Sequence, residues 1–118
     1  MGVYLIGFPS ASLQLATTPG DVLYTCPAAT HTRLDSLLVI NSNAATRTIT
    51  AYLVRSGGSI GNNNLIINAA SVPGAATAPD GRRFYFPEGL VLNPGDFIQA
   101  FASAATSLSP SGGVTETT

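Results

Sequence analysis

Charged residues are what this sequence has least of. Only 9% of its 118 residues are charged, and all five basic residues are arginine, with no lysine among them. An ordinary soluble domain carries about 25% charged residues, so Ser, Thr, Asn, Gly and Ala stand here at positions where charge is usual. Such a surface is either neutral and hydroxyl-rich by itself or buried in an assembly, because the cores of protein interfaces are depleted in charge. We favour the assembly.

The small net charge excludes several partners. The formal charge of -1 at pH 7 gives neither a nucleic acid nor an anionic membrane an attractive surface. No segment approaches the ~20 consecutive apolar residues of a membrane-spanning helix, and the N-terminus lacks the positively charged region of a signal peptide. We therefore expect no nucleic acid and no membrane as partners, and we expect synthesis and folding in the cytoplasm.

Residues that build catalytic and metal sites are scarce: there is one Cys, one His and no Trp. Cys26 lies in an apolar stretch, which indicates a packed thiol, and its spacing from His31 is too weak a basis for a cysteine nucleophile. A single histidine cannot form a histidine-based metal site without another chain. We therefore expect no enzyme and no catalytic residue, metal or cofactor, since the acidic residues are also scattered: Asp21, Asp35, Asp80, Glu88, Asp96 and Glu116.

Two polar stretches are candidate binding sites. Residues 57–61 are rich in glycine, but no Lys-Ser/Thr pair and no helix signal follow them, so a hairpin loop is favoured over a phosphate site. Arg82 and Arg83 could meet carboxylates of a partner, although a solvated strand start after the Pro-Asp-Gly turn at 79–81 is the preferred interpretation.

Helix signals are nearly absent, whereas strand signals recur at short spacing. Glu occurs twice, and no apolar pattern of helical period lasts three turns. Turn residues separate short β-prone runs. The predicted strands are 3–8, 12–16, 21–26, 31–41, 46–56, 64–72, 82–86, 89–92, 96–104 and 107–116. Roughly eight to ten short strands at this density predict one all-β domain, an antiparallel β-sandwich that is jelly-roll-like or immunoglobulin-like.

Alternation along two of these strands assigns their faces. Apolar residues at every second position predict a half-buried strand in each case. Phe97 and Phe101 fall on the reverse of a face made of small residues, so both phenylalanines need cover. The residues expected to point into the core are Ile49, Ala51, Leu53, Ile98, Ala100, Ala102 and Ala104.

Four consecutive apolar residues, Leu-Leu-Val-Ile at 37–40, lie within the predicted strand 31–41. Side chains of a strand alternate between its two faces, so this run predicts that both faces are covered. A subunit interface, a segment folded over the sheet, and a central strand beneath a loop all remain open explanations.

The N-terminus carries a second apolar group. Residues 1–19 are expected to form an N-terminal arm and edge strand, ahead of a sandwich domain at 20–118. Tyr4, Ile6 and Phe8 belong either to an ordinary edge strand or to an arm that adds a strand to a neighbouring subunit, where backbone hydrogen bonds supply the affinity. Both alternatives stay open.

The order of several short motifs resembles that of a small β-sandwich domain found in bacteriophage structural proteins. Each motif is weak by itself, and their order and spacing over about residues 20–116 carry the resemblance. The motifs are Leu-Tyr-Thr-Cys-Pro-Ala at 23–28, Ser-Leu-Leu-Val-Ile-Asn at 36–41, the Thr/Ile alternation of 46–54, Gly-Leu-Val-Leu-Asn-Pro-Gly-Asp at 89–96 followed by Phe-Ile-Gln-Ala, and Ser-Leu-Ser-Pro-Ser-Gly-Gly-Val at 107–114.

The resemblance implies a structural virion protein without catalytic residues. It implies a capsid decoration (cement) protein that docks as a homotrimer on the phage head and contacts the major capsid protein or other virion proteins. The alternative is a tail-fibre or tail-associated module that binds a host receptor or glycan through loops 56–64 and 73–81. The residues expected to face a partner are Tyr4, Ile6, Phe8, Phe97 and Phe101.

Overall fold

The computed structural model describes residues 3–7, 15–17, 21–105 and 107–118, with the backbone alone at 3–7, 87 and 88. Within these ranges the chain forms nine strands and one short 3-10 helix, which confirms the all-β class. The elements are β1 Val3–Gly7, β2 Asp21–Thr25, β3 His31–Asn41, β4 Arg47–Val54, η1 Asn62–Asn64, β5 Leu65–Val72, β6 Arg82–Leu92, β7 Phe97–Ala102, β8 Leu108–Ser111 and β9 Gly113–Thr117.

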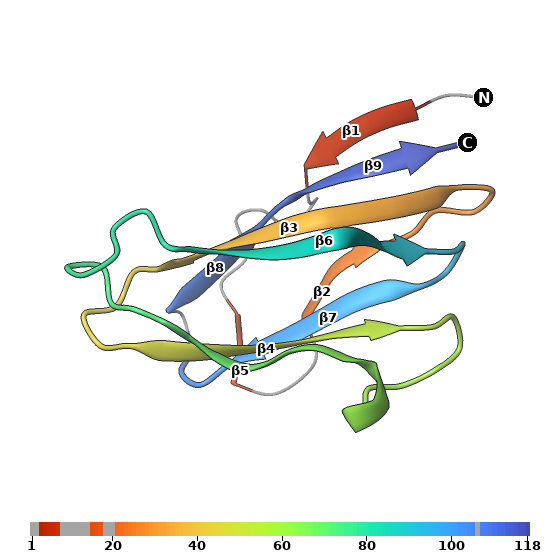
Figure 1. The fold of residues 1–118 in the computed structure, drawn as a ribbon. Helices are drawn as coiled ribbons and strands as arrows, with labels where there is room; N and C mark the ends of the chain where they lie inside the picture. The colour runs from red at the N-terminus through yellow and green to blue at the C-terminus, as the bar shows by residue number, and fades with distance from the viewer. Residues whose placement is uncertain (1–2, 8–14, 18–20, 106) are drawn as a thin grey trace.

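The strands form two antiparallel sheets that face each other (Figure 1). The β3 sheet has the order β1-β9-β3-β6, with β8 also paired to β3, and the β4 sheet has the order β2-β7-β4-β5. Four antiparallel pairs are nested in the sequence, so that each pair encloses the next: β1·β9, β2·β7, β3·β6 and β4·β5. This is the strand order of a jelly roll, with β8 and β9 together in the place of the last strand. The topology therefore selects the jelly-roll alternative.

Several predicted strand boundaries were wrong. β4 ends at Val54 instead of residue 56, and β7 ends at Ala102 instead of residue 104, so Ala104, which was expected in the core, is half-buried beyond the strand. In the predicted strand 12–16, residues 12–14 lie outside the described ranges, and 15–16 are not in a strand. Instead, the N–H of Leu15 donates to the carbonyl of Leu108, and the carbonyl of Ala16 accepts from the N–H of Ala102, so this segment joins the two sheets at one side. The predicted strand 107–116 is broken at Gly112 into β8 and β9.

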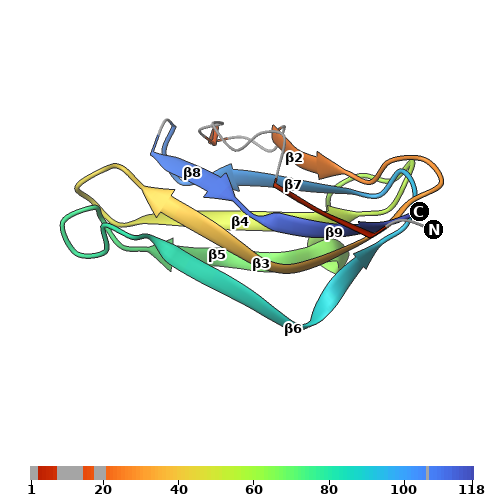
Figure 2. The same cartoon turned by 90° about the horizontal axis from the view of Figure 1, so that it is seen from above.

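The predicted strands 82–86 and 89–92 are one strand, β6, with a large bulge. Tyr85 lies opposite Ser36 and Leu90 opposite Leu34, so residues 86–89 face Asp35 alone. Gly89 takes a φ of +73°, which glycine adopts without a steric penalty. Figure 2 shows the resulting bend of β6 at the edge of its sheet. The pattern could not reveal the continuity, because a bulge interrupts the alternation on which strand prediction depends.

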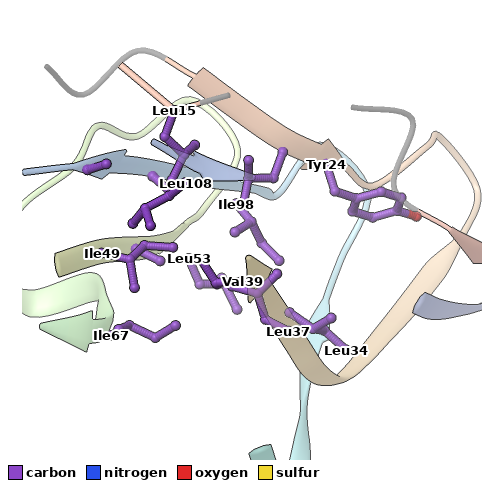
Figure 3. Close-up of a cluster of buried hydrophobic side chains, with 14 of the residues drawn as sticks. Leu15, Tyr24, Leu34, Leu37, Val39, Ile49, Leu53, Ile67, Ile98 and Leu108 are labelled. Atoms are coloured by element: carbon purple, nitrogen blue, oxygen red, sulfur yellow. The ribbon is translucent and has the colours of Figure 1, made fainter. Parts of the chain in front are cut away.

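The core lies between the sheets and follows the predicted alternation (Figure 3). Ile49 and Ala51 of β4 are fully buried and Leu53 is 8% exposed, while Ile98, Ala100 and Ala102 of β7 are at most 1% exposed. Leu15 from the joining segment also packs in the core. The side chains that complete the core from the β3 sheet are Leu34, Leu37, Val39, Leu92, Leu108 and Val114.

The apolar run of β3 is covered unequally on its two faces. Leu37 and Val39 point into the core and are fully buried, whereas Leu38 and Ile40 are half-buried on the outer face. Leu38 lies between Arg83 of β6 and Ser111 of β8 in the sheet register. Neighbouring strands of the same chain therefore supply part of the expected cover.

Candidate interaction surface

The structure separates the predicted partner-facing residues into two places. Phe97 and Phe101 lie on β7 and share the outer face of the β4 sheet, where both are half-buried. Tyr4 and Ile6 lie on β1, at the edge of the β3 sheet, opposite Glu116 and Val114 of β9. Phe8 is outside the described residues. The two phenylalanines are thus brought onto one face, and the N-terminal residues are not brought to it.

The outer face of β7 belongs to a larger uncharged and mostly apolar patch that the sequence did not define. Tyr52 of β4 stacks on Phe101 with ring centroids 6.4 Å apart and an interplanar angle of 23°. Val22 of β2, which is 42% exposed, lies opposite Gln99, between the two phenylalanines. We call Val22, Tyr52, Phe97, Gln99 and Phe101 the outer patch. Its five residues carry no charge, and they come from three adjacent strands.

One end of this outer face is covered by the chain itself. Val54 lies opposite Phe97 and is fully buried, although the buried core residue Leu53 precedes it on the strand. The backbone at Gly58 turns back beside Val54. The closeness is shown by the position that a Cβ atom at Gly58 would take, 3.5 Å from Val54 Cγ1 and 3.0 Å from the carbonyl oxygen of Arg55. The loop after β4 therefore limits the outer patch on that side.

A buried polar cluster links the two sheets behind this face. The hydroxyl of Tyr24, on β2, donates to the carboxylate of Glu116, on β9, and lies 2.8 Å from Thr32 Oγ1, on β3. Burial raises the pKa of Tyr24, and the hydrogen bond to Glu116 raises it further, so the hydroxyl stays protonated far into the alkaline range. Cys26 Sγ lies 3.2 Å from Thr32 Oγ1 in the same cluster. The arrangement holds the two sheets together through side chains of β2, β3 and β9.

Replacing Tyr24 with phenylalanine is expected to lower the free energy of unfolding by about 1–2 kcal/mol, because the carboxylate of Glu116 loses a donor in a partly buried site. Urea denaturation of the two proteins measures the difference. Tyr52→Phe, which removes a hydroxyl from the outer face, is the matched control and is expected to change stability by less than about 0.5 kcal/mol. Equal stability of the Tyr24 variant and the parent would show that the inter-sheet bond contributes nothing.

Asp96 ties three segments together at one end of the sandwich. Its carboxylate accepts hydrogen bonds from the backbone N–H groups of Asn93, at 2.8 Å, and Ser56, at 2.9 Å, and from the Arg55 guanidinium, at 2.7 Å. Its backbone carbonyl accepts from the N–H of Cys26. Burial by itself raises the pKa of Asp96, but these hydrogen bonds, that of Asn93 foremost, outweigh it and hold the pKa below its usual value. The sequence predicted the turn at 93–96, but only the fold brings Arg55 close enough to form an ion pair with Asp96.

Cys26 and His31 occupy unrelated settings. Cys26 is buried, and its thiol donates to the carbonyl of Thr30, whereas His31 is exposed, with Nδ1 3.2 Å from Asn93 Oδ1. Among the described residues, no group of three or more His, Cys, Asp or Glu side chains is placed to hold a metal ion. Within the same ranges, no helix has the length and apolar character needed to span a membrane.

Comparison of the chain with protein-family models, with curated proteins and with solved structures found no match. The assignment of a function therefore rests on the residues of the chain, its fold and the outer patch.

Proposed function

We propose that this chain is a bacteriophage capsid decoration protein, which stabilises the head by docking on the shell as a homotrimer and contacting the major capsid protein. The outer patch carries the proposal. Large apolar side chains on the outer face of a sheet are usual at sites of protein association, and charge is depleted there. Here Tyr52, Phe97 and Phe101 are presented on the two inner strands of the β4 sheet, with no charged residue among them.

The fold supports the proposal without deciding it. Jelly rolls serve as viral capsid domains, and also as lectins and cupins, so a shared architecture leaves function open. The motif order over about residues 20–116 resembles phage virion proteins, and the patch adds a surface suited to assembly. Absence of charge distinguishes this surface from the outer face of the β3 sheet, where Arg33 pairs with Asp35.

The size of the patch indicates how docking would work. A stable interface usually buries ~800 Å² on each partner, while a fully buried aromatic side chain contributes ~150–250 Å². The aromatic residues of the patch are already half-buried, so one copy docks weakly. A cyclic trimer presents three equal surfaces, and binding on a repeating lattice multiplies their weak affinities. Light scattering of the purified protein tests the trimer.

The decisive experiment adds the purified protein to phage heads that lack it. A decoration protein is expected to saturate the shell at a fixed stoichiometry and to raise the melting temperature of the heads. Failure to bind the shell, together with binding to host cells or glycans, would overturn the proposal and favour a tail-associated module that uses loops 56–64 and 73–81.

Removal of residues 1–9 tests the N-terminal arm. In the structure Val3–Gly7 pairs with Gly113–Thr117 of the same chain. If this segment also reaches a neighbouring subunit or the shell, the shortened protein is expected to dock about tenfold more weakly, since backbone hydrogen bonds to a partner strand are lost. A lower melting temperature of the protein with unchanged docking would show that β1 serves its own sheet alone.

A further inference from the structure

The sandwich has an open side where two strand edges face each other. β5 pairs only with β4, and β6 only with β3, so within the described residues each has one edge without a partner strand. Both edges lie on the same side of the molecule, as Figure 2 shows. Two hollows of about 510 and 470 Å³ lie along this side and have Ile66 in common, and we call the two together the groove.

The floor of this groove is apolar. Five side chains from β5 and β6 pack on the core and stay partly exposed; we call them the groove floor: Ile66, Ala70, Phe84, Phe86 and Leu90. Partly exposed apolar side chains of this kind suit the aliphatic side chains of an extended peptide. A sugar ring would need a flat aromatic platform, and the Phe84 ring is instead stacked beneath Arg82.

Two consecutive arginines of β6 line one end of the groove, Arg82 from the side that faces the core and Arg83 from the outer rim. The Arg82 guanidinium lies 4.6 Å from the centroid of the Phe84 ring, and Nη1 donates to the carbonyl of Ser71 at 2.7 Å. It is therefore held in place with further N–H groups available. Arg83 approaches Ser36 Oγ at 3.5 Å, the limit of a hydrogen bond. Neither arginine pairs with a carboxylate among the side chains that the structure describes.

Irregular strand edges exclude a second copy of this chain as the occupant. Edge-to-edge pairing of two copies needs flat, regular strands. β5 shifts register twice against β4, and Ala69 takes a φ of +47° with its N–H donated to Thr50 Oγ1. β6 carries the bulge at 86–89. A narrower ligand, held mostly by its side chains, fits such an edge.

We propose that this groove binds an extended, acidic segment of a partner protein. Its carboxylates lie at Arg82 and Arg83, and its apolar side chains lie on the groove floor. β5 has eight residues, so an extended segment of similar length, about 26 Å, fills the groove. The inference goes beyond the capsid proposal and does not depend on it, because the outer patch is on a different face and the test uses a peptide instead of a shell.

Fluorescence anisotropy with the full chain tests the proposal. The probe is a labelled peptide of about eight residues that alternates glutamate and valine, and the matched probe replaces each glutamate with glutamine. The acidic peptide is expected to bind at least about tenfold more tightly, and the double variant Arg82→Gln/Arg83→Gln is expected to abolish this difference. Arg33→Gln, on the outer face of the β3 sheet, is the control and is expected to change nothing.

Several results would overturn the inference: equal affinity for the two peptides, no binding of either, or an equal loss in the Arg33 variant. Direct binding of labelled polygalacturonate, without any binding of the acidic peptide, would assign the groove to an acidic glycan instead. If the double variant unfolds, Arg83→Gln alone keeps the test valid, because Arg83 makes only the long contact with Ser36 among the described residues, and it is expected to weaken acidic-peptide binding severalfold.

Discussion

The double variant Phe97→Ser/Phe101→Ser is expected to lose docking on the capsid shell while keeping its fold. Both side chains lie on the outer face of the β4 sheet, so their removal opens no cavity between the sheets. Docking multiplies the same contact over three copies, and a modest loss at each copy therefore becomes a loss of more than about 100-fold in the affinity of the trimer. Sedimentation of heads with labelled protein measures the bound fraction.

The control for this prediction is Tyr85→Ser. Tyr85 is the most exposed large aromatic residue of the described part, at 71%, and it lies on the other sheet. Its removal takes away a comparable side chain without touching the outer patch, so docking is expected to stay unchanged. If the Tyr85 variant docks as poorly as the double variant, or if the double variant docks normally, the outer patch is not the docking surface.

Replacing Asp96 with asparagine is expected to lower the free energy of unfolding by about 2–3 kcal/mol at neutral pH. The carboxylate is 4% exposed, and an amide in its place cannot accept all three hydrogen bonds from Asn93, Ser56 and Arg55. The N–H₂ group of the asparagine would also face an N–H donor of one of these partners, where no hydrogen bond can form. Denaturation in urea at pH 7 measures the loss, and Asp80→Asn, in an exposed turn, is the control, with an expected change within about 0.5 kcal/mol.

The same variant is expected to change how stability depends on acid. The pKa of Asp96 is lower in the folded chain than in the unfolded chain, so the unfolded chain binds a proton more readily. The contribution of Asp96 is therefore complete above the unfolded value of about 4 and is lost as the pH falls through the folded value. Between pH 5 and strongly acidic solution, the parent should lose more stability than the asparagine variant. Parallel curves would contradict the role given to Asp96.

The fold class and the core faces followed from local pattern. Turn residues at short spacing and alternation within 46–55 and 97–104 predicted an antiparallel sandwich, with Ile49 and Ile98 inside and Phe97 and Phe101 outside, and all four positions agree. These are properties of neighbouring residues, because a strand places successive side chains on opposite faces whichever strands lie beside it. The bulge of β6 and the break at Gly112 escaped the pattern because each disturbs that period locally.

The candidate site depended on contacts between distant residues. The sequence could name Phe97 and Phe101 as outward, but the stacking of Tyr52 on Phe101 follows from the register of β4 with β7. The sequence could not show that Tyr4 and Ile6 lie on a different sheet from the two phenylalanines, because the order of strand pairing decides which strands share a sheet.

By itself, then, the sequence determined an all-β sandwich of low charge, its inward faces and two outward phenylalanines, since local alternation and turn chemistry are sufficient for these. Only the tertiary structure decided the jelly-roll order, the outer patch, the link of Asp96 to Arg55 and the groove between β5 and β6. Each of these joins residues far apart in the chain, and their meeting is set by strand pairing and sheet packing, which a pattern of neighbouring residues does not contain.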